Sequence, residues 1–289
     1  MSTERETQLE ITVLRDNVAS RDDLSAGHGL ALLVRPRLGA FLLDTGESDE
    51  TWANADTLGL DLTQIDAVVL SHGHYDHTDG LPGLLERIGG LHIIAHPGVF
   101  EPRWSERGGE HEIGPPLARA ELEATGSWLE LSAEPIAVAP GVRTTGGVPR
   151  TAGPTMGASY LLVERDGRRV VDDFVDDISV VADVGAASVV LTGCAHAGLA
   201  NIVARATELA GRCPAAIIGG THLASALEDE IAAIAAELHE RGVRTLVPMH
   251  CTGERGAALL ERYFPGEVLR AGVGSVIEVA EDGSLTISG

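Results

Sequence analysis

The segment LSHGHYDHTDGL, residues 70–81, places three histidines and one aspartate within six consecutive positions. It directly follows the apolar run Asp66–Leu70, which predicts a short buried strand. Imidazole and carboxylate are common ligands of zinc and of other divalent first-row metals. In a tight loop that leaves a strand, His72 and His74 point to one side, and Asp76 and His77 turn toward a second position nearby. The segment therefore predicts a metal-binding loop.

Strand-length apolar runs separated by turn signals occupy the chain on both sides of this loop. A helix is expected at Thr78–Arg87. Residues 97–126 are rich in Gly, Pro, Arg and Glu, and we interpret them as an insertion or lid with one helix at Leu117–Ala124. Strands are expected at Leu9–Leu14, Gly29–Val34, Ala40–Leu43, Leu91–Ala95, Trp128–Leu131, Ile136–Val138 and Val142–Thr145.

The second half of the chain begins with an expected hairpin and then repeats a strand, a loop and a helix three times. This alternation predicts an α/β class and favours a single layered domain over residues 1–289. The expected elements are the hairpin Tyr160–Glu164 and Arg168–Val171, the pairs Ala187–Thr192 with Leu199–Leu209, Ala215–Ile218 with Ser225–Arg241 and Arg244–Val247 with Gly253–Tyr263, and the closing strands Val268–Leu269 and Ser275–Val279.

An HxHxDH loop after an apolar strand resembles the metallo-β-lactamase superfamily. The resemblance extends to Asp44 in the turn Leu42-Leu-Asp-Thr-Gly46, which resembles the aspartate that supports the metal loop from behind. It also extends to His250 at a strand end, which resembles the last histidine ligand of the superfamily. The resemblance implies an αββα sandwich, in which two mixed sheets pack face to face, helices lie outside, and the metal loop lies at one sheet edge.

Four segments together resemble one branch of that superfamily, the branch labelled 7,8-dihydropterin-6-methyl-4-(β-D-ribofuranosyl)aminobenzene-5′-phosphate synthase-like or dihydropteroate-synthase-like. The name of the branch implies a condensation that builds a phosphorylated pterin precursor. The segments are residues 71–77 (SHGHYDH), 192–198 (TGCAHAG) with Asn201 and Ile202, 219–223 (GGTHL) and 250–253 (HCTG).

The chain departs from the superfamily pattern at the third ligand of the first metal, because no histidine lies between His111 and His196. We expect His196 to take that place, with Cys194 and Asp177 as further candidate ligands. His222 follows a strand and a Gly-Gly turn. It is predicted to act on the substrate as a proton or hydrogen-bond donor, with a metal-ligand role and a structural role as alternatives.

Other charged residues give weaker signals. Arg150 and Arg103 lie in loop segments, where a guanidinium can hold a phosphate with two hydrogen bonds, although a solvated or ion-paired arginine is the alternative. His96 also follows a strand and is a third candidate substrate-binding residue. The remaining histidines carry no pattern and are expected to be structural or exposed: His28, His92, His111 and His239.

These motifs predict a metallo-hydrolase with two divalent ions, zinc first and manganese or iron as alternatives. The ligands are expected to be His72, His74, Asp76, His77, His196 and His250. Asp76 would also steer the proton of the attacking water. One alternative is a non-catalytic metal-binding or sensor protein. An iron-loaded redox site is less compatible, because the superfamily members of that kind carry Glu where this chain has His74.

We expect a small-molecule substrate, and the composition disfavours two other classes of partner. A formal net charge of −22, from 43 acidic and 21 basic residues, disfavours nucleic acid and anionic membrane surfaces as partners. All basic residues are arginine, which fits either GC-rich coding or a saline cytoplasm. Three cysteines without CxxC spacing, a charged N-terminus and the lack of a long apolar stretch lead us to expect a cytoplasmic protein. The sequence leaves the oligomeric state open.

Overall fold

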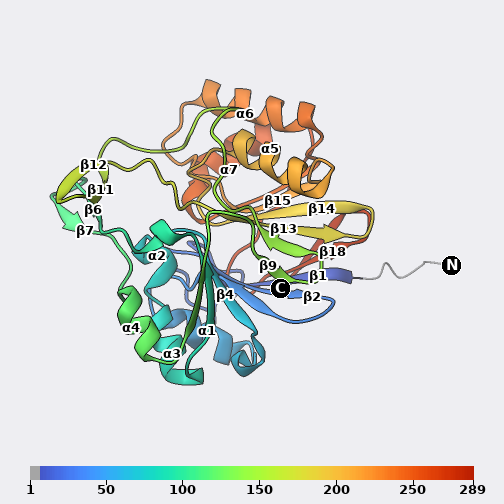
Figure 1. The fold of residues 1–289 in the computed structure, drawn as a ribbon. Coiled ribbons are helices and arrows are strands. Elements are labelled where there is room, and N and C mark those ends of the chain that lie inside the picture. Colours follow the sequence, from blue (N-terminus) through green and yellow to red (C-terminus); the bar gives the residue numbers. More distant parts are fainter. Residues whose placement is uncertain (1–6) are drawn as a thin grey trace.

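The computed structural model describes residues 7–289 and confirms the expected αββα architecture. Two large mixed β-sheets pack face to face, and α-helices cover the outer face of each sheet (Figure 1). A small third sheet projects from one end of the sandwich. Among residues 7–289, no helix combines the length and apolar character needed to span a membrane.

The first large sheet has its strands in the order β19-β18-β1-β2-β3-β4-β5-β8, and β3, β4, β5 and β8 run parallel. Its outer face carries helices from the first half of the chain. The strands are β1 (Thr7–Arg15), β2 (Ala31–Pro36), β3 (Phe41–Leu43), β4 (Ala67–Leu70), β5 (His92–Ala95), β8 (Trp128–Leu131), β18 (Val276–Ala280) and β19 (Leu285–Ser288), and the helices are α1 (Glu50–Thr57), α2 (Tyr75–Thr78), α3 (Leu81–Ile88) and α4 (Arg119–Ala124).

The second large sheet has the order β17-β16-β15-β14-β13-β10-β9, with β14 to β17 parallel. Three helices from the second half of the chain cover it. The strands are β9 (Ala137–Ala139), β10 (Val142–Thr144), β13 (Ser179–Val184), β14 (Ala187–Thr192), β15 (Ala216–Gly220), β16 (Thr245–Met249) and β17 (Glu267–Val268), and the helices are α5 (Leu199–Ala210), α6 (Glu228–Arg241) and α7 (Gly253–Tyr263).

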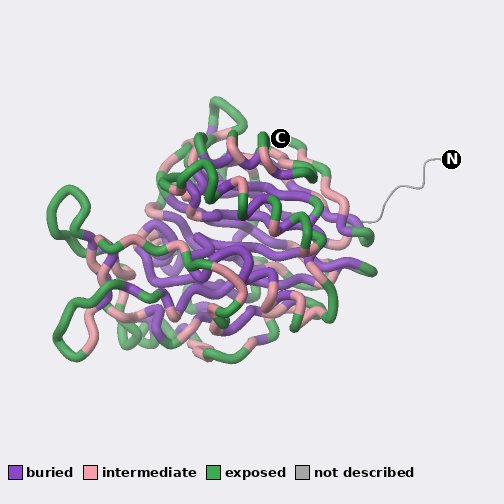
Figure 2. The backbone as a smooth tube through the Cα atoms, turned by 90° about the horizontal axis from the view of Figure 1, so that it is seen from above, coloured by how far each residue is buried: buried purple, intermediate pink, exposed green. Residues whose placement is uncertain are grey.

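The central strands are apolar throughout because both of their faces are buried. In β4, Val69 packs between the two sheets, whereas its neighbours Val68 and Leu70 pack under the helices. In β14, Val189 faces the inter-sheet core and Val190 faces the helices. This alternation follows from the two-residue period of a strand, and Figure 2 shows the buried residues gathered along the two sheets.

The third sheet gives residues 97–126 more regular structure than the sequence indicates. It has the order β12-β11-β6-β7. The hairpin β11 (Leu161–Arg165) and β12 (Arg168–Val171) agrees with expectation, and so does helix α4. Strands β6 (Arg103–Ser105) and β7 (His111–Glu112) were not expected, because both are short and polar. Helix α1 and strands β13 and β19 were also missed.

Candidate metal centre

The predicted metal-binding loop, residues 70–81, lies where the carboxyl ends of parallel strands from both sheets meet. Four residues that follow such strand ends have positive φ without being glycine: Asp44 after β3, Ala195 after β14, His222 after β15 and His250 after β16. A side chain at positive φ is sterically costly, and such residues concentrate at functional sites. Each of these sharp turns stops its strand and directs nearby side chains toward a common centre.

Asp44 is fully buried behind the loop and fixes two of its residues. Its Oδ1 accepts a hydrogen bond of 2.7 Å from the backbone N–H of Ser71. Its Oδ2 lies 2.7 Å from both the Ser71 hydroxyl and His77 Nδ1. A His77 that donates from Nδ1 to this carboxylate presents the lone pair of Nε2 to the centre, which is the tautomer a metal requires.

The first donor group consists of His72, His74 and His196, which all lie buried. One ring nitrogen of each lies within 4.8 Å of the others. The Nε2 atoms of all three are buried and have no hydrogen-bond partner among the described residues. Because an unpartnered buried polar atom is costly, three of them facing one point fit a cation that binds all three.

Two contacts fix the ring of His196, one at its Nδ1 atom and one on its face. Its Nδ1 lies 2.8 Å from the carbonyl of Met156, and the ring of Phe174 stacks on it at 3.8 Å between centroids. The turn that carries it is fixed by Asp177, whose Oδ2 accepts a hydrogen bond of 2.8 Å from the N–H of Ala197. Asp177 contributes to none of the candidate groups of ligand atoms found among residues 7–289, so it supports the first donor group from behind.

The second donor group consists of Asp76, His77 and His250. His250 Nε2 lies 3.2 Å from both His77 Nε2 and Asp76 Oδ2, and the remaining distance, between His77 Nε2 and Asp76 Oδ2, is 3.7 Å. Ligand atoms around tetrahedral zinc, with bonds of about 2.0 Å, lie about 3.3 Å apart. The three donor atoms therefore already form one face of such a polyhedron.

Two residues of the loop after β1 hold His250 in place. Asp16 accepts a hydrogen bond of 2.6 Å from the backbone N–H of His250. The side-chain oxygen of Asn17 lies 3.0 Å from His250 Nδ1, and the backbone N–H of Gly29 lies 3.3 Å from the same ring nitrogen.

Cys194 lies between the two donor groups. Its Sγ is 3.1 Å from His77 Nε2, and it also forms a candidate group with His72 and His77. On its other side it belongs to a candidate group with His222 and Cys251. The ring of His222 lies 4.3 Å from that of His196, and its buried Nδ1 has no partner among the described residues.

The electrostatic environment differs between the donor groups. Burial lowers the pKa of His74 to about 3 and holds the pKa values of His72 and His196 well below their ordinary range. Burial also opposes the charged form of His77, but the adjacent Asp44 and Asp76 raise its pKa to about 9. The lowered pKa values thus favour neutral imidazoles in the first group, while the raised pKa favours a doubly protonated imidazole at His77 when no metal is bound.

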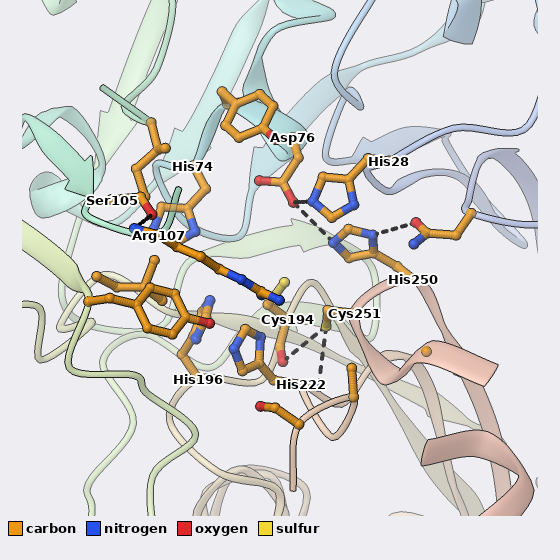
Figure 3. Close-up of a pocket in the computed structure, with 18 of the residues that line it drawn as sticks. His28, His74, Asp76, Ser105, Arg107, Cys194, His196, His222, His250 and Cys251 are labelled. Atoms are coloured by element: carbon orange, nitrogen blue, oxygen red, sulfur yellow. Dashed lines mark hydrogen bonds and ion pairs between the residues drawn. The ribbon is translucent and has the colours of Figure 1, made fainter. Parts of the chain in front are cut away.

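A cavity of about 440 Å³ opens onto both donor groups. Its wall includes His74 and His196 from the first group and Asp76 and His250 from the second, together with His222 (Figure 3). Residues of the third sheet form the opposite wall. A substrate in this cavity would therefore have direct access to any cation bound there.

The comparisons with known proteins agree with this geometry. The family model of the metallo-β-lactamase superfamily matches residues 24–205. The chain belongs to the metallo-β-lactamase superfamily. The crystal structure of a metal-dependent hydrolase of the β-lactamase superfamily superposes with a TM-score of 0.81 at 31% identity, over 94% of this chain and 99% of that one.

Two curated relatives come from Methanocaldococcus jannaschii. One is 7,8-dihydropterin-6-methyl-4-(β-D-ribofuranosyl)-aminobenzene-5′-phosphate synthase, which is 27% identical over 92% of this chain and 95% of its own length. The other is an uncharacterised protein, which is 30% identical over 87% of this chain and 94% of its own length. The similarity therefore covers nearly the whole chain.

Within this superfamily fold, the structure places the three expected substrate-binding residues away from the cavity wall. Arg103 is fully buried, and its guanidinium pairs with Asp172 at 2.9 Å and Asp176 at 2.6 Å. Arg150 donates to the carbonyl of Phe174. His96 accepts a hydrogen bond of 3.0 Å from the N–H of Gly98 within its own turn. These three expectations are corrected, because each side chain is engaged in holding a loop.

Sequence reasoning missed His28, which the structure brings to the second donor group. Its Nε2 lies 3.1 Å from Asp76 Oδ2, and the two form a candidate ligand group with His250. The signal that identifies it is the pair of flanking glycines. A side chain at Gly29 would place its Cβ 2.4 Å from the carbonyl oxygen of Asp76, so glycine is required where this loop passes the metal loop.

Proposed function

We propose that this chain is a metal-dependent hydrolytic enzyme with a dinuclear site that acts on a small anionic or phosphorylated metabolite. The observation that carries the proposal is that two distinct groups of donor atoms, His72, His74 and His196 on one side and Asp76, His77 and His250 on the other, face one cavity. Catalytic metal sites keep a position open to substrate, whereas structural sites are closed by protein ligands. The cavity therefore favours an enzyme over a metal-storage or sensor protein.

Two divalent cations, zinc first and manganese or iron as alternatives, would polarise a substrate oxygen and lower the pKa of a bound water. Asp76 lies in the cavity wall, where its carboxylate would orient the attacking water and accept its proton. His222 lies across the cavity in Figure 3. Its unpartnered Nδ1 would donate a hydrogen bond or a proton to the leaving group.

The reaction class rests on two different relatives. The structural neighbour at 31% identity is described as a metal-dependent hydrolase, which supports hydrolysis. The relative at 27% identity is a synthase whose product joins a pterin to an aminobenzene that carries a ribosyl phosphate, which supports a condensation with a phosphorylated substrate. Both reactions need an oxyanion to be held beside the two donor groups, so they share the same binding site.

The test compares the zinc-, manganese- and iron-loaded protein with chelator-treated protein on a panel of phosphomonoesters, phosphodiesters and lactones. The panel also includes a pterin-methyl diphosphate with a ribosyl-aminobenzene phosphate as acceptor, where condensation would join the pterin methyl carbon to the amino nitrogen and release pyrophosphate. Turnover that is lost on chelation and restored by one metal is the expected result. A protein that binds two equivalents of metal in a closed form, with no turnover and no exchangeable water detected by relaxation measurements, would establish the non-catalytic alternative.

A further inference from the structure

We propose that Arg107, in the turn between β6 and β7, is the anion-binding residue that selects the substrate of this cavity. The inference rests on the proposed function of the metal centre and names the feature of the substrate that the protein recognises: an oxyanion, either a phosphate or a carboxylate, attached to an apolar or ring-shaped group. Arg107 was not a candidate in the sequence, where it lies four residues after the buried Arg103.

The turn that carries Arg107 has a defined shape. Its backbone N–H donates to the hydroxyl of Ser105 at 3.2 Å. Gly108 and Gly109 follow with φ values of +77° and +110°, which residues with a side chain rarely adopt. Glu106 donates its N–H to the carbonyl of Tyr160 at 2.9 Å and so ties the turn to the segment before β11. In Figure 3 the side chain of Arg107 extends from this turn across the cavity.

The third sheet that carries this turn is joined to the metal-binding loop itself. The N–H of Tyr75, which lies between two expected metal ligands, donates to the carbonyl of Ile113 at 3.0 Å, and Ile113 in turn donates to the carbonyl of Arg103 at 2.8 Å. The buried guanidinium of Arg103 pairs with Asp176, which accepts a hydrogen bond of 2.9 Å from the N–H of Gly73. Arg103 thus contributes indirectly, because it fixes the sheet that positions Arg107 relative to the loop.

The charge distribution points to an anionic ligand. The chain carries a net charge of −22, yet among residues 7–289 the one carboxylate in the cavity wall is that of Asp76, an expected metal ligand. No described residue forms an ion pair with Arg107. By contrast, Arg169 and Arg165 of the same small sheet are paired with carboxylates at Glu110 and Glu101. A free guanidinium that faces a cavity in an acidic protein is available for a ligand, and its planar donors match an oxyanion with two hydrogen bonds.

Apart from Ser105 and His111, the rest of this wall is apolar or aromatic. Tyr75, Ile113, Tyr160 and Leu161 line the cavity on the side of the third sheet, and the guanidinium carbon of Arg107 lies 5.8 Å from the centre of the Tyr160 ring. A ring or other apolar group of the substrate would pack here while its oxyanion contacts Arg107. An amphipathic anion fits this wall better than a fully polar one.

The test measures ligand binding to the full-length zinc-loaded protein by calorimetry. The probes are phenylphosphonate, which cannot be hydrolysed to phosphate, benzoate, and the neutral benzyl alcohol. The variants are Arg107→Met, Arg107→Lys and the control Arg168→Met, which removes the same charge from an exposed position of the same sheet outside the cavity. Metal content and melting temperature are recorded for each.

Arg107→Met should weaken binding of at least one anionic probe by at least about tenfold, with little change for benzyl alcohol, and Arg107→Lys should restore part of the loss. Arg168→Met should bind like the wild type. A larger loss for phenylphosphonate assigns a phosphate, and a larger loss for benzoate assigns a carboxylate. Wild-type affinities in Arg107→Met, or an equal loss in Arg168→Met, would overturn the inference. If Arg107→Met weakens anion binding but the wild-type protein shows no turnover, the proposed enzymatic function is wrong and the anion-binding role of Arg107 stands.

Discussion

The two donor groups contain the same number of residues but differ in charge and in the residues that support them. The first consists of three imidazoles whose lowered pKa values favour the neutral form and whose buried Nε2 atoms have no hydrogen-bond partner within residues 7–289. The second combines the carboxylate of Asp76 with His77, which Asp44 holds from behind, and with His250. His28 from another loop also reaches Asp76. The difference teaches that one group is ready to accept a cation, whereas the other must first release a proton.

The largest expected effect is the loss of both metals in the double variant His72→Ala/His77→Ala, because it removes one ligand from each donor group. Mass spectrometry should find about two equivalents of metal in the wild type and close to none in the variant. His92→Ala/His239→Ala removes two histidines away from the centre and should keep the wild-type content. An unchanged metal ratio in the first variant would refute both assignments.

The next largest effect is a difference in how the metal affinities of the two donor groups depend on pH. The pKa of His77 is raised to about 9, so below that pH a cation must displace its proton. Affinity of the second group should therefore rise about tenfold per pH unit between about pH 6 and that value. The first group should show almost no change, because the pKa of His74 lies at about 3. Competition with a chromogenic chelator at several pH values checks this. If the affinities for the first and second metal equivalents changed equally with pH, the proposed difference in protonation between the two donor groups would be wrong.

Replacing Asp44 with Asn should increase the difference in metal affinity between the two donor groups. Asp44 Oδ2 lies 2.7 Å from His77 Nδ1, whereas His72 Nδ1 contacts the Ser71 hydroxyl at 2.9 Å. We expect Asp44→Asn to weaken the second group by about 10- to 100-fold and the first group much less. Zinc titration of the variant measures both steps, with the exposed Asp56→Asn as control. A larger loss at the first group would mean that Asp44 acts mainly through the loop backbone.

The smallest expected effect is that of replacing His222, which is not one of the six expected metal ligands. His222→Gln should keep both metals and the melting temperature, while kcat falls by at least about tenfold. His239→Gln, at an exposed position of α6, serves as the control. Loss of one metal from His222→Gln would make it a ligand, and unchanged kcat would make it structural.

The fold was predictable from the sequence because its signals are local. The apolar strands, the strand-loop-helix units of the second half and the HxHxDH loop each lie within short segments. Three of the missed elements have weak local patterns: α1 is polar on most of its surface, and β6 and β7 have only three and two residues. The apolar strand β13 was missed although its local pattern is strong. Such short strands form because a partner strand supplies their hydrogen bonds, and the sequence of one strand does not identify its partner.

The sequence patterns by themselves determined the α/β class and the residue types that could bind metals, because strand ends and their histidines are encoded within each motif. The αββα arrangement was implied by the resemblance of these motifs to the superfamily. Tertiary structure alone decided which arginine faces the cavity. Arg103 and Arg107 are four residues apart and look alike in the sequence. Arg103 is buried and forms ion pairs with two carboxylates that lie about seventy residues further along the chain. The turn after β6 instead directs the side chain of Arg107 into the cavity beside the metal-binding loop. Burial and charge pairing depend on distant segments, so they are settled only when the chain is folded.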